Sequence, residues 1–148
     1  MRARALLLIL DNCEHLLDAC AQVAHVLAAN TPISILATSR EGLNIAGERL
    51  YPVAPLAVPR ANEFSLAQRA LEFTAVRLFV ERARLASPQF EFDDAQVPYV
   101  IQICQRLDGI PLAIELAAAR VKQLNVREIA VRLGSRFDLL VGTRTALP

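Results

Sequence analysis

Hydrophobic positions in the first part of the chain alternate between continuous runs and helical spacing. Residues 5–10 are wholly apolar and are followed by Asp11, which is typical of a strand buried on both faces of a parallel sheet. Between 14 and 29, apolar side chains recur every three or four positions, which predicts an amphipathic helix that ends before Pro32. Because 33–38 is a second, mostly apolar run, the pattern predicts a strand, a helix and a neighbouring parallel strand.

Prolines interrupt this pattern in the middle of the chain. Residues 50–53 predict a third short strand, and Pro52, Pro55 and Pro59 indicate that the chain leaves the sheet at this point. We therefore place the boundary between two lobes at 59–70.

Apolar spacing beyond this boundary is helical throughout, and it predicts four helices. The first has its apolar stripe over 76–83. The second is capped by Asp93 or Asp94 and accommodates Pro98 only in its first turn. Gly109 is expected at the C′ position, where it ends the second helix.

The last two predicted helices have clear starting signals. Pro111 suits the first turn of the third helix, which extends to about Gln123. Asn125 and Glu128 resemble a capping box, which predicts the start of a fourth helix that ends at Gly134.

Composition excludes several classes of protein. The 148 residues are 54% hydrophobic and 21% charged with a net charge of +1, so the chain is neither disordered nor a polyelectrolyte that binds nucleic acid or acidic lipid by charge. The run 5–10 is far shorter than the roughly twenty residues of a membrane span, and no signal-peptide cleavage site follows it. The chain is therefore expected to make no membrane contact.

The cysteines favour a reduced, cytoplasmic location. There are three, an odd number, which does not suit a disulfide framework. Cys13 and Cys20 are separated by about 10.5 Å along an uninterrupted helix, too far to form a disulfide.

Two charged residues are candidates for chemistry. Asp11 and Arg40 follow neighbouring strands at the edge where open α/β sheets bind ligands. Asp11 could hold Mg²⁺ through water, and the Arg40 guanidinium could contact a terminal phosphate. The alternative is structural: a salt bridge at the sheet edge and a helix cap. Lys122 is the one lysine and is followed by Gln123, so the chain contains no G-x-x-x-x-G-K-[ST] phosphate-binding loop.

Three stretches carry a resemblance to a known family: LLLILDNCEHLLDA, ILATSREGLNIAGERLYPVAPL and ICQRLDGIPLAIELAAARV. They resemble consecutive signature blocks of STAND nucleotide-switch ATPases, in the NB-ARC-like branch of large bacterial LuxR-type transcriptional regulators. The resemblance implies an α/β fold, with a partial parallel sheet of the P-loop NTPase type followed by an all-α four-helix lobe. It places Asp11 on the Walker B acid that binds metal, Arg40 on the sensor arginine, and Pro111 on the proline of the G-x-P motif that contacts the nucleotide.

The same resemblance implies slow ATP hydrolysis and assigns no catalytic residue. Asn12 stands where vigorous ATPases carry a second acid, and an amide cannot accept a proton as a general base. Family members carry their phosphate-binding loop, Walker A, before the Walker B strand, and this sequence begins at that strand. Without the loop's N–H groups and lysine, the chain is expected to bind ATP or ADP with Mg²⁺ weakly or not at all.

The chain thus looks like a fragment of a larger module. We expect 1–58 to be the C-terminal part of a nucleotide-binding α/β domain, 59–70 a linker, 71–135 the helical lobe, and 136–148 a tail leading to a further domain. The strand that the family places beside 33–38 is missing, so an uncovered apolar sheet edge is expected.

The sequence accordingly predicts part of an ATP/ADP-binding switch module of a signal-transducing transcriptional regulator. The alternative is a nucleotide-independent interaction or oligomerisation module that binds a protein partner or a second copy. A remnant without function is a third possibility. Residues 127–135 resemble the first half of a helix-turn-helix, but no recognition helix follows them, so direct DNA contact is not expected.

Overall fold

The computed structural model describes residues 6–30, 32–60 and 66–142, and these divide into two compact units, Met1–Val53 and Ala54–Pro148. The first unit holds a two-stranded parallel sheet and the second is helical. The mixed α/β fold class predicted from the sequence is confirmed.

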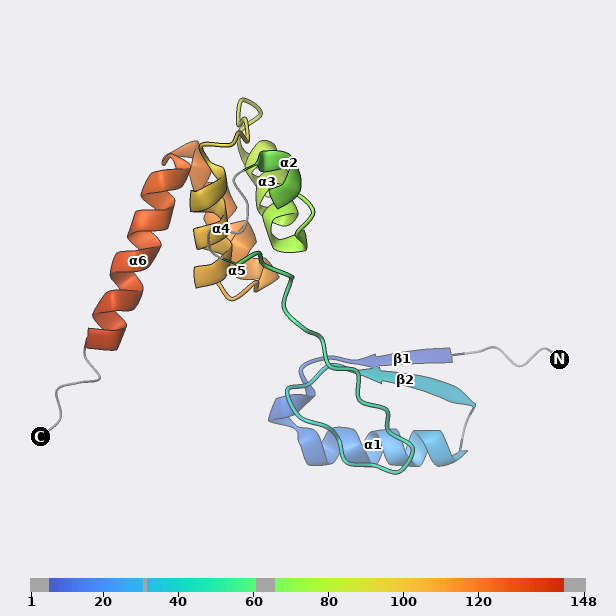
Figure 1. Ribbon diagram of the computed structural model, residues 1–148. Helices are drawn as coiled ribbons and strands as arrows, with labels where there is room; N and C mark the ends of the chain where they lie inside the picture. Colours follow the sequence, from blue (N-terminus) through green and yellow to red (C-terminus); the bar gives the residue numbers. More distant parts are fainter. Residues whose placement is uncertain (1–5, 31, 61–65, 143–148) are drawn as a thin grey trace, which may run out of the picture. The chain divides into compact units, whose positions relative to one another are not determined.

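The first unit is a strand, a helix and a parallel strand. Its elements are β1 (Leu6–Leu10), the 3₁₀ turn η1 (Cys13–His15), α1 (Leu17–Asn30) and β2 (Ile33–Ala37), as Figure 1 shows. The strands pair in register from Leu6 opposite Ile33 to Leu10 opposite Ala37. This confirms the predicted crossover, although the helix is broken near its start because Leu16, with φ −141°, separates η1 from α1.

The two faces of the sheet differ. Because side chains alternate along a strand, the register places Leu7, Ile9 and Leu36 on one face, and α1 lies against the other. The three side chains are 56%, 60% and 54% exposed. We call them the uncovered face, because no described element of the first unit covers them. The prediction of a strand buried on both faces is therefore wrong: on the face toward α1, Leu8 and Leu10 are only half-buried, and the other face is exposed.

The predicted third strand at 50–53 is wrong. These residues lie outside any strand, and Leu50, Tyr51 and Val53 are exposed. Pro52 has no N–H to donate, and the described part of the first unit offers this segment no strand pairing.

The second unit is built from helices around one apolar core. They are α2 (Ala67–Ala70), α3 (Thr74–Ala86), α4 (Val97–Arg106), α5 (Pro111–Ala118), the 3₁₀ turn η2 (Ala119–Lys122) and α6 (Val126–Gly142). The largest fully buried side chains of this core are Val76, Phe79, Val80, Val97, Val100, Ile103 and Ile114. All four predicted helices are present, and α2 is an additional short one.

The chain before α2 is bonded to the helical unit. Ala75 N–H donates to the Ala57 carbonyl at 3.2 Å, and Ala57 N–H donates to the Thr74 hydroxyl at 3.1 Å. The side-chain amide of Gln105 reaches the Pro59 carbonyl at 2.8 Å. The segment from Ala54 onward belongs to the second unit, and these bonds tie Ala57 and Pro59 to its helices, whereas 1–58 was predicted to belong with the sheet.

Several predicted helix starts are confirmed. Pro98 and Pro111 both lie in the first turns of their helices, α4 and α5. Before α6, Glu128 N–H donates to Asn125 Oδ1 at 2.9 Å and Asn125 N–H donates to Glu128 Oε2 at 3.1 Å, which is the predicted capping box. The predicted cap by Asp93 or Asp94 is wrong, because the N-cap residue of α4 is Gln96 and no side chain caps the helix. Asp93 accepts the Gln96 N–H at 3.1 Å in the turn before α4, and Asp94 accepts the Ala67 N–H at 2.7 Å.

Three predicted helix ends are wrong. Helix α5 ends at Ala118 and is followed by η2, whereas the prediction extended the helix to about Gln123. Helix α6 passes through Gly134 and ends at Gly142, and the Arg106 guanidinium occupies the space that a side chain at 134 would need. Helix α4 ends with Leu107 at its C-cap, so the C′ residue is Asp108, with φ 51°, and Gly109 follows it with φ 66°. Of the predicted linker and tail, 61–65 and 143–148 lie outside the described residues.

Across the described ranges, no helix combines the length and apolar character that crossing a membrane requires.

Candidate functional site

The carboxyl ends of β1 and β2 meet at a hydrogen-bonded group centred on Thr38. Leu10 and Ala37 are paired, so Asp11 and Thr38, the residues that follow them, lie opposite each other. The Thr38 hydroxyl donates to Asp11 Oδ1 and accepts the N–H of Asn12 at 3.0 Å. One threonine side chain thus orients the candidate metal-binding carboxylate and holds the turn that follows it.

The backbone of Thr38 completes this arrangement. Its N–H donates to the Leu10 carbonyl, and its carbonyl accepts the N–H of Cys13, both at 2.9 Å. The chain reverses between these bonds because Asn12 is left-handed, with φ 57°, a conformation that asparagine tolerates better than most residues. Thr38 was not among the residues predicted to be functional, although it ends the second apolar run.

Arg40 is paired with Glu14, not with Asp11. Arg40 Nε lies 3.3 Å from Glu14 Oε1, and the two side chains are 79% and 18% exposed. The salt bridge between Asp11 and Arg40 that the structural alternative required is not among the ion pairs of the described residues. Asp11 and Arg40 do lie on the same edge of the sheet, as predicted, but each has its own partner.

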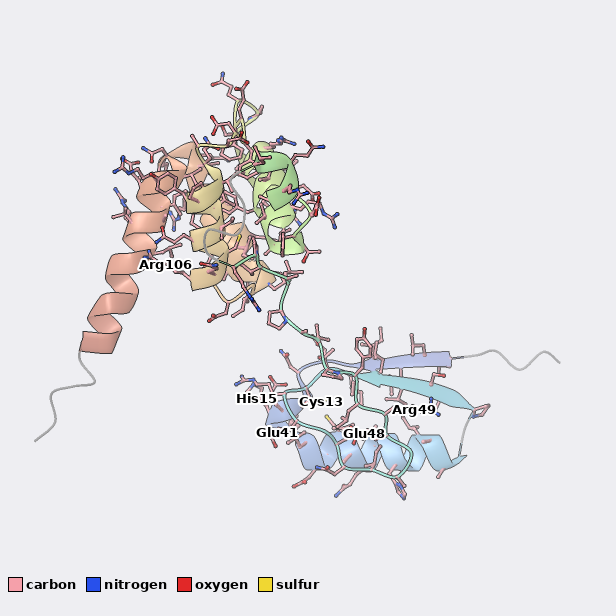
Figure 2. All side chains as sticks on the ribbon, in the orientation of Figure 1. Cys13, His15, Glu41, Glu48, Arg49 and Arg106 are labelled. Atoms are coloured by element: carbon pink, nitrogen blue, oxygen red, sulfur yellow. The ribbon has the colours of Figure 1, made fainter. Side chains whose placement is uncertain are left out.

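The loop after Arg40 is closed by Glu48. Its carboxylate accepts the N–H groups of Leu43 and Asn44, both at 2.8 Å. Its own N–H donates to the Ile45 carbonyl at 3.2 Å. Glu48, labelled in Figure 2, therefore folds the segment that follows Arg40 back on itself.

Cys13 is buried directly beneath the strand ends. Its thiol donates to the Leu10 carbonyl at 3.6 Å, and burial, together with a hydrogen bond to the Cys20 side chain, raises the pKa of the thiol. The chain between Cys13 and Cys20 is not one continuous helix, because Leu16 separates η1 from α1. Both thiols are free.

Pro111 belongs to the second unit, where it is exposed at the start of α5. The first unit brings Asp11 and Arg40 to one edge of the sheet, and Pro111 stands on the other unit. Its place in a first helical turn has a local cause: its fixed φ and missing N–H suit that position.

The donor set at Asp11 fits a hard cation. Asp11 is exposed and combines a carboxylate with the nearby Thr38 hydroxyl, and oxygen ligands of this kind suit Mg²⁺. The described residues contain no cluster of three or more histidine, cysteine or acidic side chains that could hold a metal. Asp11 therefore offers a single carboxylate, and other ligands have to come from a substrate or water.

Comparison with known proteins finds similar chains in mycobacteria. A protein of Mycobacterium bovis and one of Mycobacterium tuberculosis, each named a "putative HTH-type transcriptional regulator", are 45% identical over 140 residues, or 94% of this chain. An uncharacterized protein of Mycobacterium tuberculosis is 44% identical over 137 residues, or 92% of this chain.

These relatives are much longer than the present sequence. The matched part is 14% of the length of the regulators and 32% of that of the uncharacterized protein. No family model matches the chain, and no solved structure matches it.

Proposed function

We propose that this chain supplies the metal-binding acid and the phosphate-sensing arginine of an ATP/ADP switch in a transcriptional regulator. The observation that carries the proposal is the hydrogen bond from Thr38 to Asp11, which holds an exposed carboxylate at the carboxyl edge of a parallel sheet. Ligands of open α/β sheets bind at this edge. The names of the mycobacterial relatives support a regulatory role.

Each residue has a definite task in this proposal. Asp11 would hold Mg²⁺, which would neutralise phosphate charge when the nucleotide is bound. Thr38 keeps the Asp11 carboxylate in place. Arg40 would contact the terminal phosphate, so that its environment differs between ATP and ADP, and Pro111 would contact the nucleotide from the helical unit.

Slow turnover suits a switch of this kind. The Asn12 N–H is already bonded to Thr38, and its side chain is an amide that cannot accept a proton as a base. A phosphate-binding loop is missing from the sequence, and such loops contribute the main affinity for nucleotide in related sites. We therefore expect the 148-residue chain to bind nucleotide weakly, with a dissociation constant on the order of millimolar.

Amide chemical shifts test the proposal directly. We expect Mg²⁺–ATP at millimolar concentration to shift the amide signals of Asn12, Thr38 and Arg40 in the ¹⁵N-labelled chain. Asp11→Asn should abolish the shifts because the amide has lost the charge that binds the cation. Asp18→Asn, which removes an exposed acid from the first turn of α1, is the matched control and should preserve them. An unshifted spectrum of the wild-type chain would contradict the proposal.

The uncovered face favours a second candidate function, a nucleotide-independent interaction module. Leu7, Ile9 and Leu36 expose apolar surface on one face of the sheet. Sedimentation velocity checks this candidate: a chain that self-associates through this face should become monomeric on Ile9→Thr, while Leu85→Thr, on the helical unit, should have no effect. A wild-type chain that stays monomeric at high concentration would argue against self-association.

A further inference from the structure

We propose that Glu14 is a positioning residue for Arg40: it holds the guanidinium by its Nε, so that the two terminal nitrogens can serve an anionic group such as a terminal phosphate. The proposal rests on the proposed function and deepens it by naming what prepares the sensing arginine. Its basis is the ion pair between Arg40 Nε and Glu14 Oε1 at 3.3 Å.

The unequal exposure of the two partners shows which one is fixed. The Glu14 side chain is 18% exposed and that of Arg40 is 79% exposed. Glu14 lies on η1, and this turn is anchored because Cys13 N–H donates to the Thr38 carbonyl at 2.9 Å. The carboxylate is therefore the rigid partner, and the arginine is the long, solvent-facing side chain that it orders.

Guanidinium geometry allows both contacts at once. The group carries five N–H donors in a planar fork, so a carboxylate on Nε leaves the terminal edge available for a second acceptor. Ordering a long side chain before the ligand arrives removes an entropic cost of binding. Losing that order should weaken binding about three- to tenfold, the size expected for immobilising one such side chain.

A positioning role and a purely electrostatic role of Glu14 predict different results for Glu14→Gln and Glu14→Ala. Glu14→Gln removes the negative charge but retains a side-chain oxygen that can accept from Arg40 Nε, whereas Glu14→Ala removes both. A positioning role therefore predicts rescue by glutamine. A purely electrostatic role predicts that the two variants behave alike. Glu41→Ala is the matched control, because it removes a nearby exposed carboxylate, whereas the ion pair of Arg40 is with Glu14.

The experiment measures the ¹H–¹⁵N heteronuclear NOE of the Arg40 Nε–H in the full chain, with the signal assigned through Arg40→Lys. We expect a high NOE for Arg40 in the wild type, in Glu14→Gln and in Glu41→Ala. In Glu14→Ala the NOE of Arg40 should fall to that of the exposed Arg49. A parallel titration with Mg²⁺–ATP should show the three- to tenfold loss of affinity in Glu14→Ala alone.

The outcomes separate this proposal from the proposed function. If the NOE of the Arg40 Nε–H is low in the wild type, or is unchanged in Glu14→Ala, the positioning role of Glu14 is overturned whether or not nucleotide binds. If Glu14 orders Arg40 but nucleotide shifts no signal at the strand ends, the positioning stands and the nucleotide switch fails. Equal affinity for Mg²⁺–ATP in the wild type and Glu14→Ala would overturn the positioning role. Should Glu14→Ala not fold, an NOE in Glu14→Gln as low as that of Arg49 would overturn it too.

Discussion

The backbone of Leu56 lies directly against Gly109. A Cβ atom at 109 would stand 2.3 Å from the Leu56 carbonyl oxygen, closer than real contacts allow. The Leu56 N–H donates to the Gly109 carbonyl at 2.9 Å, and Gly109 has φ 66°. Conformation and space both require glycine here, between α4 and α5, where the sequence analysis expected only a helix stop.

Replacing this glycine should therefore be costly. We expect Gly109→Ala to lower the free energy of unfolding by about 3 kcal/mol, from the left-handed backbone and the displaced Leu56 segment together. Urea unfolding followed by circular dichroism measures the loss. Gly47→Ala is the control: its φ is 84° but no atom lies within 4 Å of the new Cβ. Equal costs at the two positions would show that the contact with Leu56 contributes nothing.

The hydroxyl of Thr38 should protect the turn after β1. Thr38→Val keeps the shape of the side chain but leaves the Asn12 N–H without its acceptor, at a cost of about 1 kcal/mol. We expect the Asn12 amide to exchange faster with solvent in Thr38→Val and at the wild-type rate in Thr38→Ser. Unchanged exchange in the valine variant would mean that the hydroxyl does not hold the turn.

Gly134 and Arg106 should be energetically coupled. The Arg106 guanidinium, labelled in Figure 2, donates to the Ala130 carbonyl of α6, and a Cβ at 134 would lie 2.4 Å from its Nη1. We expect Gly134→Ala to destabilise the wild type by about 1 kcal/mol, because the displaced arginine outweighs the gain in helix propensity.

Removing the Arg106 side chain should reverse the sign of the stability change caused by Gly134→Ala, which a double-mutant cycle measures. In an Arg106→Ala background the space is free, and Gly134→Ala should then stabilise the chain by up to about 1 kcal/mol, the difference in helix propensity between glycine and alanine. Chemical denaturation of the four proteins provides the measurement. The same change in stability in both backgrounds would exclude the coupling.

The thiol of Cys104 should make stability depend on alkaline pH. Burial raises the pKa of this thiol to about 12 from an ordinary value of 9.0. The unfolded chain therefore loses the proton first, and stability that is complete below about pH 9 should fall as the pH rises, by about 1 kcal/mol per pH unit. Urea unfolding at pH 8 and pH 10 measures the slope, and Cys104→Ala should reduce it.

Alkylation offers an independent check of the thiols. Burial is the main cause of the raised pKa of both Cys13 and Cys104, and thiolates are the reactive form. We expect iodoacetamide to modify the partly exposed Cys20 first in the native chain, and the other two only after unfolding. Rapid native labelling of Cys104 would contradict its burial.

Signals within one segment predicted much of the fold, and contacts between segments account for the errors. The capping box of Asn125 and Glu128 and the first-turn Pro111 depend on their own sequence neighbours, so pattern alone located them. The extension of α6 past Gly134 depends on Arg106 from another helix, which no local pattern reveals. The segment 50–53 has suitable residues, but among the described residues it pairs with neither β1 nor β2, and Pro52 cannot donate an N–H to a strand.

At the candidate site, too, single residues could be predicted from the sequence but contacts between segments could not. Asp11 and Arg40 could be identified from the sequence because each follows an apolar run closely. Their partners were not, because Thr38 reaches Asp11 only through the strand register, and Glu14 reaches Arg40 only because the chain turns at the left-handed Asn12. The ion pair of Arg40 with Glu14 therefore depends on the turn at Asn12 and η1. The prediction of one continuous helix over 14–29 did not include that turn.

The uncovered face has a consequence for how long the chain survives in a cell. An apolar patch left in water favours aggregation, and chaperones and proteases remove molecules that unfold. A partner that covered Leu7, Ile9 and Leu36 would bind only the folded state and so lower the unfolded fraction. We therefore expect the cellular level of this chain to rise when this face is covered.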